Sequence, residues 1–188
     1  MEEQNKEVVW VIDPVHTRIR FDAKYLMLTS VSGWFTQFEG TVITHGDDFD
    51  GSQVQLTIYT NSVYTGNDER DSHLKSADFF DTAKYPVITW TSSSVKIQGD
   101  FIEALGTLAI KDVKQAIALQ VKYVGTTQDL NGNSKAGFTL EATFNRKDFN
   151  ITWNQVLDKQ GLMLSDEVLL HCDVQLLRLP CRGGAPSA

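Results

Sequence analysis

The stretch Val54-Gln55-Leu56-Thr57-Ile58-Tyr59-Thr60 decides the fold class, because its apolar and polar residues alternate. A period of two places successive side chains on opposite faces of a strand, so this stretch predicts a half-buried β-strand. The same alternation recurs along most of the chain. It predicts further strands over residues 17–24, 35–44, 87–98, 101–110, 117–123, 138–144 and 168–176.

Turn signals separate these segments. They lie at Gly46-Asp47-Asp48, Gly99-Asp100, Lys111-Asp112 and Asn131-Gly132-Asn133. Short connections join antiparallel neighbours, because a parallel pair of strands needs a long crossover. A β-sandwich and a closed barrel both satisfy this pattern, and about eight long strands favour a barrel just wide enough to hold one small ligand. We therefore predict an all-β fold, an antiparallel eight-stranded β-barrel.

One segment departs from the period of two and predicts a short helix over residues 67–76, beside the barrel. Asn67 is a suitable N-cap, and the two acidic residues that follow it suit the positive end of a helix. Arg70, His73 and Leu74 are three and four residues apart, so they share one face of this helix.

The composition is that of a globular protein. The chain has 188 residues, of which 41% are hydrophobic and 22% charged, and its formal net charge is -7. An acidic chain without a Lys/Arg cluster is a poor nucleic-acid binder, because phosphate binding needs a positive stripe. The longest apolar runs, such as residues 8–12, are far too short to cross a bilayer, so we predict no transmembrane segment.

The chain divides into three parts. Residues 1–7 are polar and are expected to form a flexible N-terminus, residues 8–179 form the barrel domain, and residues 180–188 are expected to be a disordered tail. The N-terminus lacks the basic start and apolar stretch of a secretory signal, which predicts a cytoplasmic protein, or a periplasmic one if a signal was removed. A homodimer is one of the assemblies that the sequence allows for this protein. Cys172 lies in a strand pattern and is expected to be a buried thiol, whereas Cys181 lies in the tail.

Familiar catalytic and metal-binding motifs are absent from the sequence. It contains no Gly-rich phosphate loop, His-Glu-x-x-His, Cys-x-x-Cys or Gly-x-Ser-x-Gly, and its four histidines are scattered. We therefore predict no catalytic residue, no metal site and no cofactor. Arg146 is more informative, because it has the same strand parity as Phe144. Either it bends out to water at the strand end, or it lies at the barrel mouth and holds a polar head group or a carboxylate of the helix.

Six pieces of the chain together carry a resemblance. They are Trp10-Val11-Ile12-Asp13-Pro14-Val15-His16-Thr17, Gly33-Trp34-Phe35-Thr36-Gln37-Phe38-Glu39-Gly40, Ser62-Val63-Tyr64-Thr65-Gly66 with Arg70-Asp71-Ser72-His73-Leu74, Asp78-Phe79-Phe80-Asp81 with Tyr85-Pro86-Val87-Ile88-Thr89-Trp90, Arg146-Lys147-Asp148-Phe149, and Leu164-Ser165-Asp166-Glu167-Val168. In this order they cover residues 8–179. The sequence is similar to the YceI-like family. Asn150 departs from the family pattern by replacing a glycine, but Asn tolerates a left-handed backbone better than most residues.

The resemblance implies a lipocalin-like barrel with an elongated apolar cavity for polyisoprenoid or related lipids, whereas the residue types alone do not tell a hollow barrel from a filled one. The cavity wall is assigned to Phe21, Phe35, Phe38, Ile58, Phe79, Phe80, Trp90, Leu119, Phe138, Phe144, Trp153 and Leu170. The polar head group of the ligand is assigned to Arg70, His73 and Arg146. Alternatively, Arg70 pairs with the neighbours of Asp71 or with Asp148 and fixes the helix to the barrel.

The leading functional hypothesis is therefore a non-enzymatic protein that binds a polyisoprenoid, an isoprenoid quinone precursor or a fatty-acid-type lipid. Binding would serve carriage, storage or a stress response. Two alternatives stay open. One is an enzyme that acts on an isoprenoid or quinone-like substrate with His73 as acid or base. The other is a filled barrel that acts as an interaction module.

Overall fold

The computed structural model describes residues 7–46, 48–156 and 162–180. The expected disordered tail, including Cys181, lies outside the described residues except for Pro180. The expected flexible N-terminus also lies outside them except for Glu7, which begins the first strand.

The described residues form an antiparallel β fold with one short α-helix. The strands are β1 Glu7–Ile12, β2 Arg18–Tyr25, β3 Thr29–Phe35, β4 Phe38–His45, β5 Gln53–Tyr59, β6 Val63–Tyr64, β7 Val87–Gln98, β8 Phe101–Ile110, β9 Val113–Gln128, β10 Ser134–Asn145 and β11 Leu164–Arg178. The helix α1 spans Asp68–Lys75, and two short 3-10 helices span Thr60–Ser62 and Arg146–Phe149. Every predicted strand is present within a few residues of its expected ends.

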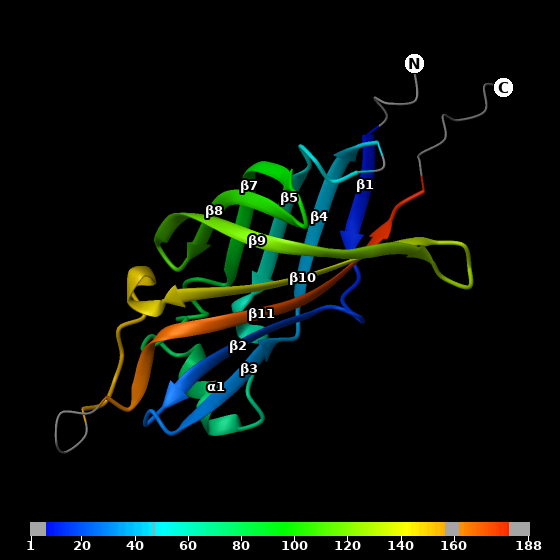
Figure 1. Ribbon diagram of the computed structural model, residues 1–188. Coiled ribbons are helices and arrows are strands. Elements are labelled where there is room, and N and C mark those ends of the chain that lie inside the picture. Colours follow the sequence, from blue (N-terminus) through cyan, green and yellow to red (C-terminus); the bar gives the residue numbers. More distant parts are fainter. Residues whose placement is uncertain (1–6, 47, 157–161, 181–188) are drawn as a thin grey trace.

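Eight strands close into a barrel, in the order β1, β4, β5, β7, β8, β9, β10 and β11, with β11 pairing back to β1 (Figure 1). This confirms the predicted eight-stranded antiparallel barrel. The other three strands, β2, β3 and β6, extend the sheet from β11, outside the ring of eight. The first half of β11 pairs with β2, its last residues pair with β1, and β3 continues the ladder from β2 to β6.

The bend between β1 and β2 is held by a partly buried carboxylate. Asp13 accepts hydrogen bonds from Lys135 Nζ at 2.9 Å, Gln175 Nε2 at 2.8 Å and His16 Nδ1 at 2.9 Å. Burial raises the pKa of Asp13, but the hydrogen bonds from these three side chains outweigh burial and hold the pKa well below its ordinary value. The corner of the first two strands is thereby fastened to β10 and β11.

The predicted strand over residues 35–44 is interrupted at Thr36 and Gln37. At this point Ser62 Oγ accepts a hydrogen bond from the backbone N–H of Gln37 at 3.0 Å, so a side chain replaces a regular ladder bond. The strands β1, β3 and β6 were not predicted as separate elements, and β1 takes a place in the ring of eight. In β3, polar Thr29, Ser30 and Ser32 obscure the alternation.

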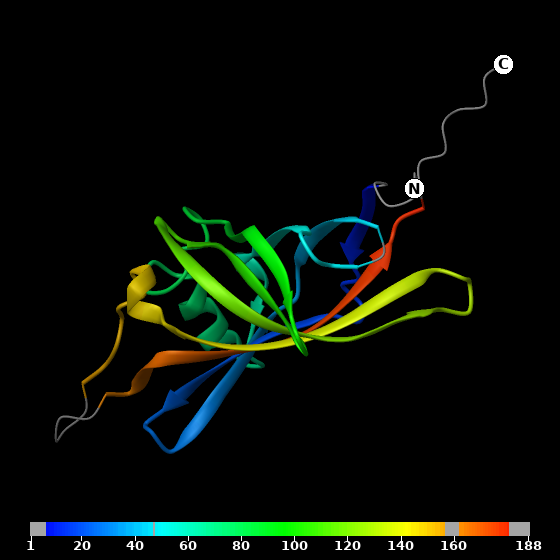
Figure 2. The same cartoon turned by 45° about the horizontal axis from the view of Figure 1, so that its top comes forward.

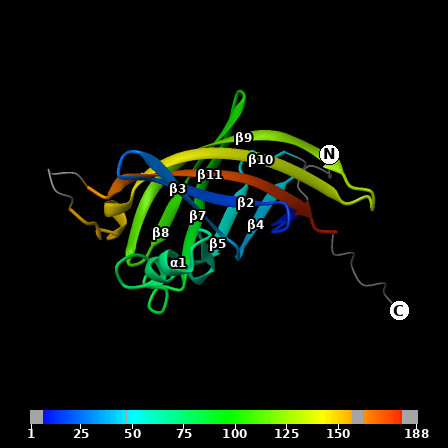
Figure 3. The ribbon, with the colours of Figure 1, turned by 90° about the horizontal axis from the view of Figure 1, so that it is seen from below.

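Helix α1 confirms the predicted helix and its cap. The side chain of Asn67 accepts a hydrogen bond from the backbone N–H of Arg70 at 2.9 Å. Asp71 is buried and accepts from the backbone N–H of Thr65 at 2.9 Å and from Thr65 Oγ1 at 2.5 Å. The view from below shows α1 lying across one end of the barrel (Figure 3).

Asn150 has a φ of 57°, in the left-handed region, so this residue does support the turn after Phe149 at the position where the YceI-like pattern has glycine.

Within the described part of the chain, no helix has both the length and the apolar character needed to span a membrane.

Candidate ligand-binding cavity

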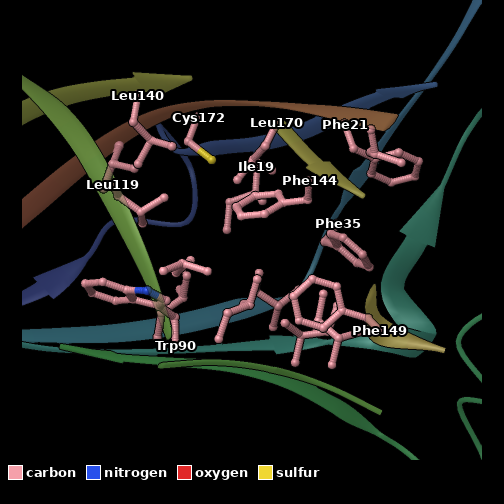
Figure 4. Close-up of a pocket in the computed structure, with 18 of the residues that line it drawn as sticks. Ile19, Phe21, Phe35, Trp90, Leu119, Leu140, Phe144, Phe149, Leu170 and Cys172 are labelled. Carbon is pink, nitrogen blue, oxygen red and sulfur yellow. The ribbon is translucent and has the colours of Figure 1, made fainter. Parts of the chain in front are cut away.

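The barrel encloses an apolar cavity of about 590 Å³, within the usual range for small-molecule sites. The inward side chains of the strands form its wall, because each strand turns every second residue toward the interior. Figure 4 shows Leu140, Leu170 and Cys172 on one wall and Trp90 on the opposite wall. The barrel is therefore hollow.

The structure places eleven of the twelve residues assigned to the wall along this cavity. They are Phe21, Phe35, Ile58, Phe79, Phe80, Trp90, Leu119, Phe138, Phe144, Trp153 and Leu170. Phe38 is the exception. It packs against the apolar core beside Ile58, its partner in the β4–β5 ladder, and does not line the cavity.

An aromatic plug lies at the cavity end opposite α1, and sequence reasoning missed it. Phe49, in the loop between β4 and β5, is only 7% exposed and lines the cavity. Its ring centroid lies 4.9 Å from that of Phe138 and 5.4 Å from that of Trp10. The loop turns through Gly46 and Gly51, which both have positive φ. The sequence did offer one signal, a single Phe within a turn of Asp and Gly residues. A large apolar side chain in a polar turn is expected to be buried against the barrel.

The mouth lies at the α1 end, and we define it by five lining residues, Tyr25, Arg70, His73, Trp153 and Met163. His73 Nε2 lies 2.8 Å from Asp78 Oδ2, and the His73 ring meets the Trp153 ring edge-on at 4.6 Å. This contact joins α1 to the segment before β11. The mouth is therefore lined by aromatic rings, together with a histidine that pairs with a carboxylate and an arginine.

Arg70 is exposed and holds the chain just before α1. Its Nε donates to Thr65 Oγ1 at 2.7 Å, and its Nη2 donates to the Thr65 carbonyl at 2.9 Å. Thr65, rather than Asp148, is therefore the residue to which Arg70 binds. The guanidinium also borders the cavity, so a ligand group at the mouth can reach it.

Arg146 is buried, at 5% exposure, and so does not bend out to water as one interpretation expected. Its Nη1 donates to the carbonyls of Ile151 at 2.8 Å and Trp153 at 2.7 Å, and its Nε donates to the carbonyl of Ser165 at 2.9 Å. Burial lowers the pKa of Arg146, and Asp166, 3.4 Å from Nη2, partly offsets this. The carboxylate it meets therefore comes from β11 and not from the helix.

Arg146 thus lines the cavity, but it donates most of its hydrogen bonds to protein carbonyls. These bonds connect residues 151–153 to the start of β11. Its neighbours explain why strand parity alone did not reveal this role. The acceptors are backbone carbonyls of a segment that follows the strand, and carbonyl positions carry no signature in the sequence. Arg70 and His73, by contrast, line the cavity at its mouth.

Cys172 is a buried thiol in the cavity wall, as its strand pattern predicted. Burial raises its pKa to about 12, and the nearby Asp173 adds to this effect, so the thiol stays protonated near neutral pH. Its neighbour His171 points outward and pairs with Glu141 at 3.0 Å. No group of His, Cys, Asp or Glu side chains suited to a metal ion occurs within the ranges that the structure describes.

Comparison with known proteins gives a consistent result. The model of the YceI-like domain matches residues 10–176. Protein YceI from Salmonella newport is 39% identical over 137 residues, which make up 73% of this chain and 72% of that protein. The crystal structure of the Campylobacter jejuni YceI protein is 30% identical and superposes with a TM-score of 0.69, covering 84% of this chain and 90% of that one.

A second solved structure shares the fold at lower identity. It is described as a polyisoprenoid binding domain from Saccharophagus degradans, is 18% identical, and superposes with a TM-score of 0.68 over 90% of this chain and 98% of that one. The family match spans nearly the whole described barrel, and the hollow eight-stranded architecture agrees with it. This chain belongs to the YceI-like family.

Proposed function

We propose that this protein binds one long apolar lipid of the isoprenoid class inside the barrel, for carriage or storage, without altering it chemically. The observation that carries the proposal is the cavity itself, which is apolar along most of its wall, has Phe49 at one end, and has the charged or titratable Arg70 and His73 near the mouth. Each methylene moved from water into such a site contributes about 0.8 kcal/mol, so a long chain binds tightly with few polar contacts.

The shape of the cavity favours an elongated ligand. On β10 the lining residues extend from Phe138 to Phe144, a distance along the strand of about 20 Å at the usual rise per residue. The fold neighbour described as a polyisoprenoid binding domain supports the choice of an isoprenoid over other long lipids. A polyisoprenoid alcohol or an isoprenoid quinone combines such a chain with one small polar end.

We place the polar end of the ligand at the mouth and its tail toward Phe49. Arg70 and His73 both line the mouth, where Arg70 binds Thr65 and His73 pairs with the exposed Asp78, so neither side chain is enclosed by buried carbonyls as Arg146 is. The plug at the other end consists of aromatic rings and suits an apolar tail. This orientation keeps the head group near water, so its desolvation cost is small.

The two alternative functions meet different difficulties. A filled barrel is inconsistent with a cavity of about 590 Å³. Catalysis has one observation in its favour, since the His73–Asp78 pair at 2.8 Å could act as an acid or base. Recovery of the added isoprenoid unchanged after prolonged incubation with the protein supports binding, whereas a new product would establish an enzyme.

A titration of the delipidated protein with a polyisoprenoid alcohol tests the proposal, with tryptophan fluorescence as the signal because Trp90 and Trp153 line the cavity. The variant Ala104→Phe places a ring in the cavity wall, where Ala104 is 5% exposed. Ala118→Phe on the neighbouring strand makes the same change at an exposed position and is the matched control. We expect saturable binding by the wild type and the control, and loss of binding by Ala104→Phe.

Ala104→Phe also overpacks the interior if the barrel closes around it, at a cost of typically 1–3 kcal/mol. Thermal unfolding of all three proteins therefore accompanies the titration. Undiminished binding by a folded Ala104→Phe protein would place the ligand outside the barrel. No binding by the wild type would reject the proposed function.

A further inference from the structure

The turn between β2 and β3 presents apolar side chains to solvent. Met27 is 71% exposed and Leu28 is 82% exposed. Leu26 and Met27 both have positive φ, 54° and 58°, which is uncommon for residues other than glycine. The turn is nevertheless held by backbone hydrogen bonds, from Leu26 N to the Met163 carbonyl at 2.8 Å and from Leu28 N to the Tyr25 carbonyl at 3.1 Å. The structure thus fixes these side chains outward.

This turn adjoins the mouth of the cavity. Tyr25 and Met163 both line the cavity, and Met163 receives the hydrogen bond from Leu26. Val156 and Leu162, which form an isolated β-bridge with each other, are 73% and 42% exposed and belong to the segment that leads into Met163. We call the set Tyr25, Met27, Leu28, Val156 and Leu162 the apolar rim. Figure 2 shows the β2–β3 turn at the opposite end of the molecule from the β9–β10 turn.

The charge of the β2–β3 hairpin differs from that of the whole protein. Arg18, Arg20 and Lys24 are exposed, whereas the hairpin's one carboxylate, Asp22, is bonded by Arg20 at 2.8 Å and by Ser32. From residue 25 to residue 38 the sequence contains no charged residue. The hairpin taken alone carries more positive than negative charge, but Arg18 lies opposite Asp173 of β11 and Arg20 pairs with Asp22. Lys24 is the exposed basic residue next to the apolar turn, and it can face a surface that carries negative charge.

We propose that the apolar rim docks on a membrane of anionic phospholipid, with Met27 and Leu28 in the interface and the exposed Lys24 near the phosphates. Apolar side chains flanked by basic residues are the usual features of interfacial membrane binding. Docking would give an isoprenoid an unbroken apolar path from the bilayer past Tyr25 into the cavity. The inference rests on the proposed function and adds the source from which the ligand is loaded.

Flotation with vesicles tests this proposal. The wild type is mixed with vesicles of phosphatidylcholine alone and of equal parts phosphatidylcholine and phosphatidylglycerol, and is compared with the double variant Met27→Ser/Leu28→Ser. The double variant Val124→Ser/Leu130→Ser is the matched control, because these residues are 64% and 106% exposed but lie on β9 and in the β9–β10 turn. Substitutions at such exposed positions are expected to leave folding nearly unchanged.

The wild type and the control are expected to float with the anionic vesicles, while Met27→Ser/Leu28→Ser binds at least roughly tenfold more weakly, because two apolar side chains no longer enter the interface. Equal flotation of both double variants, or no flotation of the wild type, would overturn the docking proposal. So would a wild-type dimer that becomes a monomer only in Met27→Ser/Leu28→Ser, since the rim would then bind a second copy. The fluorescence titration with dissolved isoprenoid separates the two proposals, because Met27→Ser/Leu28→Ser should still bind it.

Discussion

Three charged side chains, the buried Asp71 and Arg146 and the partly buried Asp13, each bind groups outside their own element. Asp13 fastens the β1–β2 corner to Lys135 of β10 and Gln175 of β11. Asp71 binds Thr65 ahead of α1, and Arg146 binds carbonyls on both sides of residues 157–161. Burying a charge is costly unless it is paired, so each of these residues is stabilising only while its partners are present.

Asp13→Asn is expected to lower the free energy of unfolding at pH 7 by about 1–3 kcal/mol, because hydrogen bonds from charged donors are lost. In the wild type, folding lowers the pKa of the Asp13 carboxyl below its unfolded value of about 3.9. The stabilisation by the ionised Asp13 is therefore present above the unfolded pKa and is lost as the pH falls through the folded pKa. The difference between wild type and variant should therefore be full at pH 7 and shrink below about pH 4.

Urea unfolding at a series of pH values measures this difference. Asp173→Asn, at an exposed position of β11, is the control and should leave stability unchanged near neutral pH. A difference between wild type and Asp13→Asn that stays constant down to pH values well below the ordinary carboxyl pKa would show that the charge of Asp13 is not what stabilises the corner.

Arg70→Ala is expected to weaken binding of an anionic isoprenoid, such as an isoprenoid phosphate, by about tenfold, while the neutral alcohol loses less. The low end of the range for charge-assisted hydrogen bonds applies because Arg70 is exposed. The tryptophan titration gives both affinities. Lys75→Ala removes the same charge from the same helix at a residue that does not line the cavity, and it is the control. Equal losses for both ligands, with lower thermal stability, would mean that Arg70 only holds Thr65.

At the scale of the elements, helix α1 is held by its preceding segment more than by its own sequence. Helical spacing places Asp71 four residues from Lys75, which favours a surface ion pair, yet Asp71 is buried and binds Thr65. The spacing of residues within a helix cannot reveal that the chain before it folds back. The position of Arg70 and His73 at the mouth depends on this contact.

Asp71→Ala is expected to lower the free energy of unfolding by about 1–3 kcal/mol, since the Thr65 N–H and hydroxyl lose a buried acceptor. It should also weaken ligand binding, because α1 borders the mouth. Asp68→Ala, at an exposed position in the first turn of the helix, is the control and should cost only a few tenths of a kcal/mol. Urea unfolding measures both, and equal effects of the two substitutions would show that the Thr65 contact does not hold the helix.

Alternation of residues made the barrel predictable, because a strand with one buried face leaves that period in its sequence. The same alternation, together with the family resemblance, located most of the cavity wall. It failed where the chain is irregular. Phe49 belongs to a turn, β3 is interrupted by polar residues, and the acceptors of Arg146 are backbone carbonyls. These features depend on how loops pack against the barrel, which local patterns do not record.

At the scale of the molecule, the pairing of β11 with β1 closes the sheet into a barrel that encloses the cavity. The first half of β11 pairs with β2 and its end pairs with β1, so the barrel stays closed while its first strands bend apart. The result is an elongated interior with an aromatic plug at one end and helix α1 at the other. The proposed isoprenoid binding rests on this interior, and the proposed membrane docking rests on the apolar rim at its open end.

Native mass spectrometry of the protein saturated with a polyisoprenoid alcohol, followed by organic extraction, tests the central claim most directly. The account predicts one isoprenoid per chain for the wild type and for Ala118→Phe, released intact by the solvent, and none for folded Ala104→Phe. Absence of a bound isoprenoid from the wild type, or equal retention by Ala104→Phe, would contradict a ligand held inside the barrel.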